Sequence, residues 1–426
     1  MKRISGRHIY LNPAKALMTA FVILILFRIP RSFLGIPYLY SIRYMMRSLG
    51  DEYQVFGITF VELVAIAIGL ILYTQRRNEK TRYLLLLAVV ALINIGRFLF
   101  GLSNPFEYNS YEIFLTLLVA FSCGTMIEHY YRTSNQIEVV LDLIITLFFI
   151  FQMYYVVIGK KGGTGSYGTV GISSGGLALC YATYVLLKLL NNEHGVRSIA
   201  LIAVSIVGLV LTGSRTQLLL LFGFLVIYVG FYLSITNGRK WMIIGIGTLA
   251  LVALLMSQDT IAILANNRKI QSIMKIFSTG LYSYITGDAS ALERFKTWTV
   301  GFGIIQENPL GISCSFMDLQ TRMFRGGSPT FPHSFLLAYY LLLGLPAIVI
   351  YFQWWKVTIK TKKMDIGITL VLIYILLLLT FYGGVITEYL MAFWLFLVYS
   401  YTTKRITEKE LENSKEEYGD NYESGI

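Results

Sequence analysis

The sequence predicts an all-α polytopic membrane protein with about twelve transmembrane helices and one large extracytoplasmic loop. Of its 426 residues, 55% are hydrophobic and only 14% are charged, whereas a soluble domain carries roughly a quarter charged residues. Apolar runs that could cross about 30 Å of hydrocarbon as helices recur from residue 14 to residue 401. Helices are expected because open sheet edges cannot satisfy their hydrogen bonds in lipid. An ordinary soluble enzyme is therefore excluded.

The apolar runs divide the chain into four regions. Residues 1–256 are expected to hold transmembrane helices one to nine, and residues 334–401 helices ten to twelve. The hydrophilic stretch 257–333 between them is too long for a structureless loop, so we expect amphipathic helices and a function there. Residues 402–426 are charged and poor in apolar side chains, which predicts a disordered cytoplasmic tail. The expected spans are 14–29, 55–73, 83–100, 111–127, 139–158, 174–190, 199–212, 217–235, 241–256, 334–354, 366–382 and 389–401.

The distribution of Lys and Arg predicts that both termini are cytoplasmic. With the N-terminus inside, the inner connections at 76–82, 239–240 and 356–363 are basic, and the outer loops at 101–110 and 383–388 contain no Lys or Arg. This asymmetry follows the positive-inside rule and places 257–333 outside. Nucleic acid is not an expected partner, because the net charge of +12 is explained by cytoplasmic loops. The exceptions, attributed to local salt bridges or headgroup contacts, are Arg31, Arg43, Arg47, Lys160 and Lys161.

The first candidate site is the tight connection Thr212-Gly213-Ser214-Arg215-Thr216-Gln217 on the outer face. Ser214 and Gln217 have the spacing of a capping box, which predicts Ser214 as the N-cap and Arg215 as the first helical residue. A cation at the positive end of a helix dipole is unfavourable unless an anion lies beside it. Free backbone N–H groups and a guanidinium together suit a phosphate. An interfacial arginine touching lipid headgroups is the alternative.

The second candidate lies in the large loop. Ser290 and Glu293 again have capping-box spacing, and apolar residues recur at helical spacing until Pro309. This pattern predicts an amphipathic helix lying on the membrane. Arg294, in its first turn, shares a face with Trp298, so a cation and an aromatic ring could meet one ligand. An ordinary surface helix with a snorkelling arginine is the alternative.

The third candidate is His333, where the loop re-enters the membrane. It is the one histidine expected outside, since His8, His129 and His194 fall on the inner side. A solitary histidine cannot form a metal site and the chain has no Asp-x-Asp pair, so no metal cofactor is expected and a nucleotide-sugar enzyme with a bound divalent ion is disfavoured. A histidine can accept a proton from a hydroxyl nucleophile near neutral pH. The alternative is a histidine that only caps a helix.

Two further residues are secondary candidates. Arg97 lies near the outer end of its expected span, where snorkelling to the surface is the favoured interpretation. Glu388, in the last outer loop, could pair with one of the arginines.

Taken together, the motifs resemble the signature of the bacterial O-antigen ligase and polysaccharide polymerase superfamily, which serves O-antigen, capsule and exopolysaccharide biosynthesis. They are Gly213-Ser214-Arg215-Thr216, Arg294 with Trp298, Pro309-Leu310-Gly311, and His333 with Gly344, within roughly residues 199–346. The resemblance implies a GT-C-like glycosyltransferase in the bacterial inner (plasma) membrane. It also implies a donor glycan on undecaprenyl pyrophosphate and an acceptor hydroxyl on a second glycan, meeting at the outer face. Ligase-like members usually have Asn after the histidine, where this chain has Ser334, which counts against a ligase.

The resemblance also implies roles for the motif residues. Arg215 and Arg294, with Ser214, would bind the pyrophosphate and offset the charge that develops as it departs. His333 would orient or deprotonate the attacking sugar hydroxyl. The transfer would be metal-independent and would invert the anomeric configuration.

The function predicted is a repeat-unit polymerase that uses lipid-linked oligosaccharides as both donor and acceptor. A ligase that transfers a finished glycan to another acceptor is the nearest alternative. A flippase or exporter of lipid-linked glycans is an alternative of a different class, but transporters usually place polar residues near mid-membrane. Here the candidates cluster on one face. Expected partners are the two lipid-linked glycans, the bilayer, and a chain-length regulator or a flippase.

Overall fold

A computed structural model describes part of the chain as helices. The described residues are 13–27, 60–74, 108–158, 172, 174–190, 196–228, 289–307, 309, 334–362, 365–381 and 389–423. No strand element occurs within these ranges, which agrees with the predicted all-α class. The helices are α1 (Pro13–Phe27), α4 (Phe60–Thr74), α6 (Tyr108–Tyr130), α7 (Ser134–Val157), α8 (Ser174–Leu190), α9 (Val196–Thr212), α10 (Arg215–Ile227), α15 (Ala289–Glu307), α17 (Phe335–Leu343), α18 (Leu345–Lys362), α19 (Ile366–Phe381) and α20 (Tyr389–Glu423).

Each expected span that falls on described residues coincides with helix, while 83–100 and 241–256 lie outside them. The span expected at 334–354 is divided into two helices. Gly344 ends α17 with φ 72° and ψ −144°, a conformation that glycine adopts without steric cost. Pro346 then lies in the first turn of α18, where its missing N–H is not needed.

Only some of these helices have the dimensions of a full membrane span. In the described part of the chain, α7 alone has at least 18 residues and enough apolar character to cross a bilayer. Shorter apolar helices are α1, part of α4, most of α8, α9 and most of α19.

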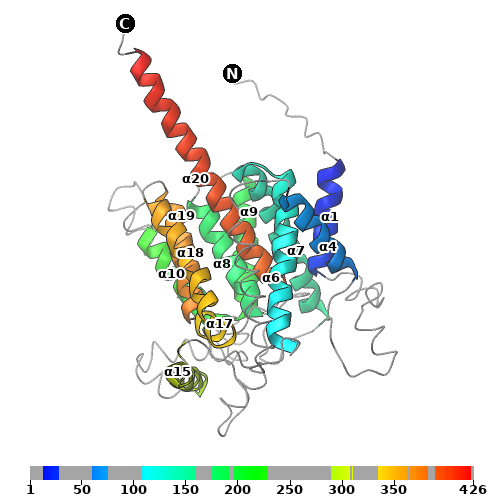
Figure 1. Ribbon diagram of the computed structural model, residues 1–426, viewed down its shortest axis with the longest axis vertical. Coiled ribbons are helices and arrows are strands. Elements are labelled where there is room, and N and C mark those ends of the chain that lie inside the picture. Colours follow the sequence, from blue (N-terminus) through cyan, green and yellow to red (C-terminus); the bar gives the residue numbers. More distant parts are fainter. Residues whose placement is uncertain are drawn as a thin grey trace, which may run out of the picture.

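The helices pack as a bundle with α15 placed across one end (Figure 1). Most run roughly along the long axis of the molecule, whereas α15 is seen nearly end-on in the same view. At the opposite end, where α1 also starts, α20 continues beyond the bundle. The bundle thus has one end marked by α15 and another marked by α20.

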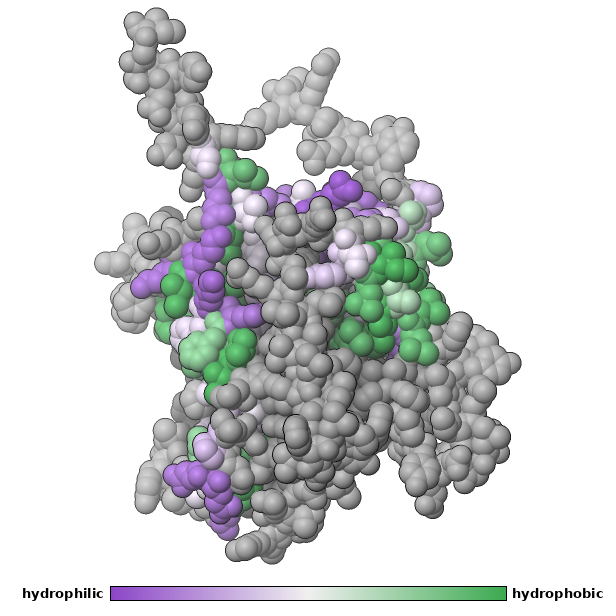
Figure 2. All heavy atoms as spheres, in the orientation of Figure 1, coloured by the Kyte–Doolittle hydropathy of each residue, from purple (hydrophilic) through white to green (hydrophobic). Residues whose placement is uncertain are grey.

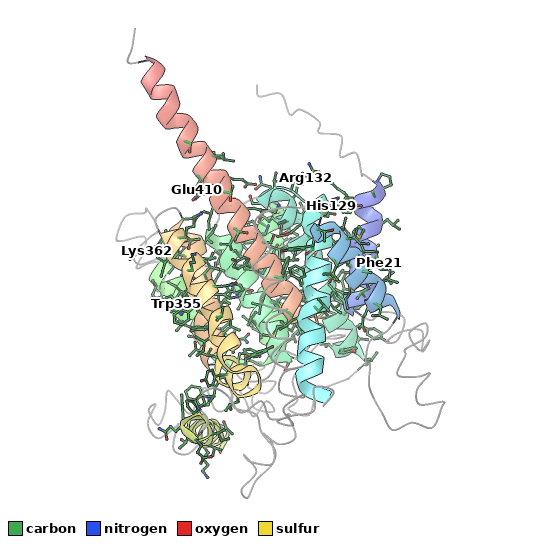
Figure 3. All side chains as sticks on the ribbon, viewed as in Figure 1. Phe21, His129, Arg132, Trp355, Lys362 and Glu410 are labelled. Atoms are coloured by element: carbon green, nitrogen blue, oxygen red, sulfur yellow. The ribbon has the colours of Figure 1, made fainter. Side chains whose placement is uncertain are left out.

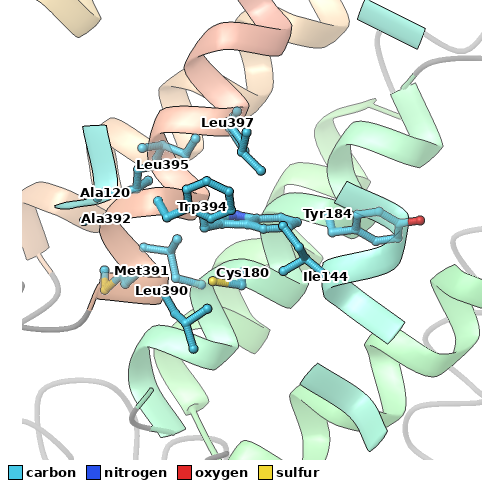
Figure 4. Close-up of a cluster of buried hydrophobic side chains, with 14 of the residues drawn as sticks. Ala120, Ile144, Cys180, Tyr184, Leu390, Met391, Ala392, Trp394, Leu395 and Leu397 are labelled. Atoms are coloured by element: carbon cyan, nitrogen blue, oxygen red, sulfur yellow. The ribbon is translucent and has the colours of Figure 1, made fainter. Parts of the chain in front are cut away.

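The core is built around Trp394 of α20 (Figure 4). This side chain is fully buried, and its indole N–H donates to Thr183 Oγ1 on α8 at 2.8 Å. Burying the aromatic ring removes a large apolar area from solvent, and the hydrogen bond satisfies its one polar atom. Phe148 of α7 and Tyr184 of α8 pack against the same ring. Trp394 thereby joins three helices from distant parts of the chain.

The region expected to be a disordered tail from residue 402 is helical instead, since α20 continues to Glu423. Its first turns beyond Tyr401 are held by neighbouring helices. Lys409 Nζ lies 2.5 Å from Asp365 Oδ2, and Lys360 Nζ lies 2.9 Å from Glu410 Oε1. The charged composition of this region predicts too little apolar burial to keep it ordered. The region nevertheless continues the packed part of α20, so no new helix has to be nucleated.

Polar residues gather at both ends of the bundle. In the view of Figure 2, hydrophilic side chains follow α20 and its end of the bundle and appear again on α15, with hydrophobic side chains between them. Figure 3 places His129, Arg132 and Glu410 at the α20 end. His129 therefore lies at the end opposite α15, on the side from which the tail leaves.

Candidate functional site

The α9–α10 connection has the geometry that its sequence predicts. Gly213 has φ 64°, a left-handed conformation that favours glycine. Ser214 follows with extended backbone angles as the N-cap, and α10 begins at Arg215. The predicted helix start is confirmed, and only two residues separate the two helices.

The capping box predicted here is not formed. Ser214 makes no side-chain capping bond, and Gln217 is buried and donates through Nε2 to the Gly175 carbonyl of α8 at 3.0 Å. The Ser-x-x-Gln spacing predicts a hydrogen bond within one helix, whereas Gly175, the residue that Gln217 contacts, belongs to another helix. A tertiary hydrogen bond has therefore replaced the reciprocal cap.

The start of α10 has the electrostatics of an anion site. The first N–H groups of a helix have no intrahelical acceptors, and the dipole makes this end positive. Ser214 does not cap them with its side chain, and uncapped N–H groups at a helix start can bind an anion. The Arg215 side chain lies outside the described part of the structure, so only its place at the first residue of the helix is established.

The α15 helix exists where the second motif predicts it, but it starts earlier than expected. It begins at Ala289, so Ser290 is already helical and is not the N-cap. Arg294 consequently lies in the second turn instead of the first. The helix ends at Glu307, two residues before Pro309, as the proline predicted. The Arg294 side chain is outside the described residues.

One face of α15 packs against the bundle. Thr297, Gly301 and Ile304 are buried, and a Cβ on Gly301 would lie 2.8 Å from Leu337 Cδ2 of α17. By helical register Arg294 belongs to the same face as Thr297 and Gly301, at the i, i+3 and i+7 positions. The motif arginine is thus on the turn that precedes the α15–α17 contact.

Trp298 of α15 is half-buried and packs against the core cluster. This contact anchors α15 to the bundle. The structure therefore shows that Trp298 packs against the bundle. The contact of Trp298 with a ligand stays a prediction.

His333 itself lies outside the described residues, but the chain immediately after it is well defined. Ser334 is buried and caps α17, accepting a hydrogen bond from the Leu337 N–H at 3.2 Å. Farther along α17, the Tyr340 hydroxyl donates to the Pro309 carbonyl just after α15. The segment that follows His333 is therefore joined to the Arg294 segment by this hydrogen bond and by the contact of Leu337 with Gly301.

The three motif-bearing segments share neighbours in the bundle. The α17 helix packs against α15, α18 and α19, and α10 packs against α8 and α19. The α19 helix is thus a common neighbour of α10 and α17. The structure brings the Arg294 segment next to the segment after His333 and links the Arg215 segment to them through α19.

Other predicted site residues are not tested by these contacts. Arg97 and Glu388 lie outside the described part of the chain. Among the residues that are described, no three His, Cys, Asp or Glu side chains gather in a group that could hold a metal ion. Sequence reasoning missed the contacts of Gln217 and Tyr340, because their partners are Gly175 and Pro309 on other segments.

Comparison with known proteins agrees with the positions of these motifs. Residues 200–352 match the sequence model of a family described as O-antigen ligase. This segment, over a third of the chain, includes most of α9, all of α10, α15 and α17, and part of α18. No curated protein and no solved structure matches the chain significantly. Members of the matched family are glycosyltransferase-like, membrane-associated enzymes that work with lipid-linked glycans. This match supports, for residues 200–352, the resemblance to the O-antigen ligase and polysaccharide polymerase superfamily.

Proposed function

We propose that this protein is an oligosaccharide repeat-unit polymerase. It transfers a glycan from an undecaprenyl-pyrophosphate donor to a sugar hydroxyl of a second lipid-linked unit, at the outer face of the bacterial inner membrane. The reaction needs neither a metal nor a nucleotide, because the pyrophosphate is already an activated leaving group.

The packing of α15 against α17 is the observation that carries this proposal. It joins the segment of Arg294 to the segment that follows His333, through Gly301 and Leu337 and through Pro309 and Tyr340. Both segments lie within the O-antigen ligase match. A transferase needs its leaving-group site and its base close together, because both act on one bond.

Arg215 and Arg294 are proposed to bind the pyrophosphate, with Ser214 at the same helix start. Guanidinium groups form paired, charge-assisted hydrogen bonds with phosphate oxygens. The N-terminal end of α10 adds N–H donors and a positive dipole. As the bond between the anomeric carbon and the phosphate oxygen breaks, negative charge grows on the pyrophosphate, and these groups stabilise it. Trp298, Arg97 and Glu388 are proposed as secondary contacts.

His333 is proposed as the group that orients or deprotonates the acceptor hydroxyl. The hydroxyl oxygen attacks the anomeric carbon opposite the leaving group, its proton passes to the imidazole, and undecaprenyl pyrophosphate leaves with the bonding electrons. This in-line substitution inverts the anomeric configuration. A histidine is suited to the step because its pKa normally lies near neutrality.

The proposed topology is a GT-C-like bundle of about twelve transmembrane helices with both termini cytoplasmic. The placement of α15 at one end of the bundle and the departure of α20 from the other support it (Figure 1). The hydrophobic side chains between two polar ends also support a membrane-embedded middle (Figure 2). In this topology α15 lies along the outer surface.

Reconstitution tests the proposed activity. The purified protein is placed in liposomes with undecaprenyl-pyrophosphate-linked repeat units, and chain length is followed by gel. We expect a ladder of products, and we expect Arg215→Ala, Arg294→Ala and His333→Ala each to abolish it while the proteins still insert. Lys296→Ala is the matched control, because Lys296 is an exposed cation on α15. Ladders of wild-type length from all three variants would remove the site assignment.

A ligase is the second candidate, because the matched family is described as O-antigen ligase. The chemistry at the leaving group is the same, and only the acceptor differs. Supplying one donor together with a glycan acceptor that is not linked to undecaprenyl pyrophosphate distinguishes the two. A single transfer to that acceptor with no ladder identifies a ligase, and a ladder on lipid-linked units alone identifies a polymerase.

A further inference from the structure

We infer that Gln217 is a positioning residue that holds the first turn of α10, and with it the backbone of Arg215, in place to stabilise the pyrophosphate as it leaves. The inference rests on the proposed function, since it assigns Gln217 to the same site. Gln217 does not touch the ligand in this account. It acts through the helix turn that it shares with Ser214 and Arg215.

Two hydrogen bonds hold this turn, one to α8 and one to α19. The Gln217 side chain is fully buried and donates through Nε2 to the Gly175 carbonyl on α8 at 3.0 Å. The Gln217 main-chain carbonyl accepts from the Tyr374 hydroxyl of α19 at 3.4 Å. The start of α10 is thereby tied to α8 by a side chain and to α19 by the main chain.

A glutamine at this position is costly unless its hydrogen bond is needed. A buried amide loses its hydration, and an apolar side chain of similar length would avoid that cost. An amide has one advantage over an apolar side chain here, because its hydrogen bond fixes both the distance and the angle between Gln217 and Gly175. With only Gly213 and Ser214 joining α9 to α10, a displacement of Gln217 moves Arg215 with it.

Gln152 of α7 provides a matched control. It is equally buried, donates through Nε2 to the Gly208 carbonyl of α9 at 3.1 Å and accepts from the Tyr181 hydroxyl of α8 at 3.1 Å. These two hydrogen bonds hold α7, α8 and α9 together. Replacing either glutamine removes buried hydrogen bonds, but Gln217 lies within the first turn of α10 beside Arg215, whereas Gln152 lies on α7.

Steady-state kinetics of the full-length protein in nanodiscs test the inference. The Gln217→Met and Gln152→Met variants are compared with an undecaprenyl-pyrophosphate-linked donor at temperatures below their measured unfolding midpoints. For Gln217→Met we expect kcat to fall about 10- to 100-fold, as misplacement of a catalytic group does, with KM for the donor unchanged. Gln152→Met is expected to keep the wild-type kcat. Equal losses of kcat in the two variants would overturn the inference.

Hydrogen exchange provides a readout that does not depend on activity. We expect the amides of residues 214–222 to exchange faster in Gln217→Met than in the wild type or in Gln152→Met. If Arg215→Ala is fully active, the proposed function fails, and the exchange data still decide whether Gln217 holds the turn. An unchanged exchange rate in Gln217→Met would show that the hydrogen bond from Gln217 to Gly175 does not hold this turn. Gln217→Asn, whose amide is too short to reach Gly175, is expected to behave like Gln217→Met and serves if the methionine variant does not insert.

Discussion

Gly301 of α15 lies directly against Leu337 of α17, so that a methyl group on Gly301 would come within 2.8 Å of Leu337 Cδ2 and 3.3 Å of its Cγ. A side chain at residue 301 would force the Leu337 side chain to shift or the two helices to move apart. The contact sets the distance between the segment that carries Arg294 and the segment that follows His333. The sequence alone did not single out Gly301, since glycine within a helix also occurs where nothing lies nearby.

Replacing Gly301 by valine is expected to displace α15 from α17 and to abolish glycan transfer. Overpacking of a close contact costs about 1–3 kcal/mol. Gly303→Val is the matched control, because a Cβ on Gly303 would meet nothing within 4 Å. Transfer assays and cysteine cross-linking between α15 and α17 measure the effect. Similar activity in the two variants would show that the contact does not position the site.

Gly208 of α9 provides a second close approach, in the middle of the bundle. A Cβ there would lie 2.5 Å from the Tyr181 ring of α8, and the Tyr181 hydroxyl is already held by Gln152. Gly208→Ala is therefore expected to lower the thermal unfolding midpoint, whereas Gly223→Ala on α10, with nothing within 4 Å, is expected to leave it unchanged. An unchanged midpoint for both variants would contradict the close packing of α8 and α9.

Lys188 is predicted to be the critical member of a buried charge cluster on α7 and α8. Its Nζ lies 2.8 Å from Asp142 Oδ1 and also contacts Glu138. Lys188→Met would leave two carboxylates without their buried cation, and breaking such a pair costs about 3–5 kcal/mol. Arg197 also reaches Asp142, at 3.1 Å, but its side chain is 66% exposed, so Arg197→Met is expected to cost less than about 1 kcal/mol.

Thermal unfolding in nanodiscs checks this difference. A second substitution, Glu138→Gln in the Lys188→Met background, removes one unpaired carboxylate and is expected to restore part of the lost stability. If Lys188→Met and Arg197→Met lower the midpoint equally, the cluster does not depend on Lys188.

Glu408 is expected to stabilise the start of α7 from the α20 helix. Its carboxylate accepts from the Ser134 N–H at 2.9 Å and from the Ser134 hydroxyl, and a negative charge is favourable at a helix N-terminus. Glu408→Ala leaves those buried donors without this acceptor, at a cost of about 1–3 kcal/mol. Glu412→Ala, an exposed residue one turn later on α20, should be neutral in the same unfolding measurement. Equal midpoints for the two variants would exclude the capping role.

The positions of the helices could be predicted from the sequence because lipid and core both require long apolar runs. The apolar runs at 139–158 and 174–190 coincide closely with α7 and α8. The break at Gly344 was missed, although Gly-Leu-Pro is a recognisable helix breaker. Helicity beyond residue 402 was missed because it depends on Lys409 and Glu410 finding partners on other helices.

The candidate site could be predicted only in part. Ser214 as the N-cap of α10 follows from local residue types and is confirmed. The hydrogen bond from Gln217 to Gly175 is not a local property, because its partner lies on α8, 42 residues away in sequence. Tertiary partners of this kind cannot be read from spacing, and they decide how a motif residue is held.

Cysteine accessibility in intact cells tests the central claim most directly, which is that Arg215, Arg294 and His333 meet at one outer membrane boundary. Each is replaced by cysteine in a background without the native cysteines, and a membrane-impermeant maleimide is applied with and without the lipid-linked donor. The account predicts labelling of all three positions from outside, and protection of all three by the donor. Labelling of any one of them only after permeabilisation would place it on the other side of the membrane and contradict the account.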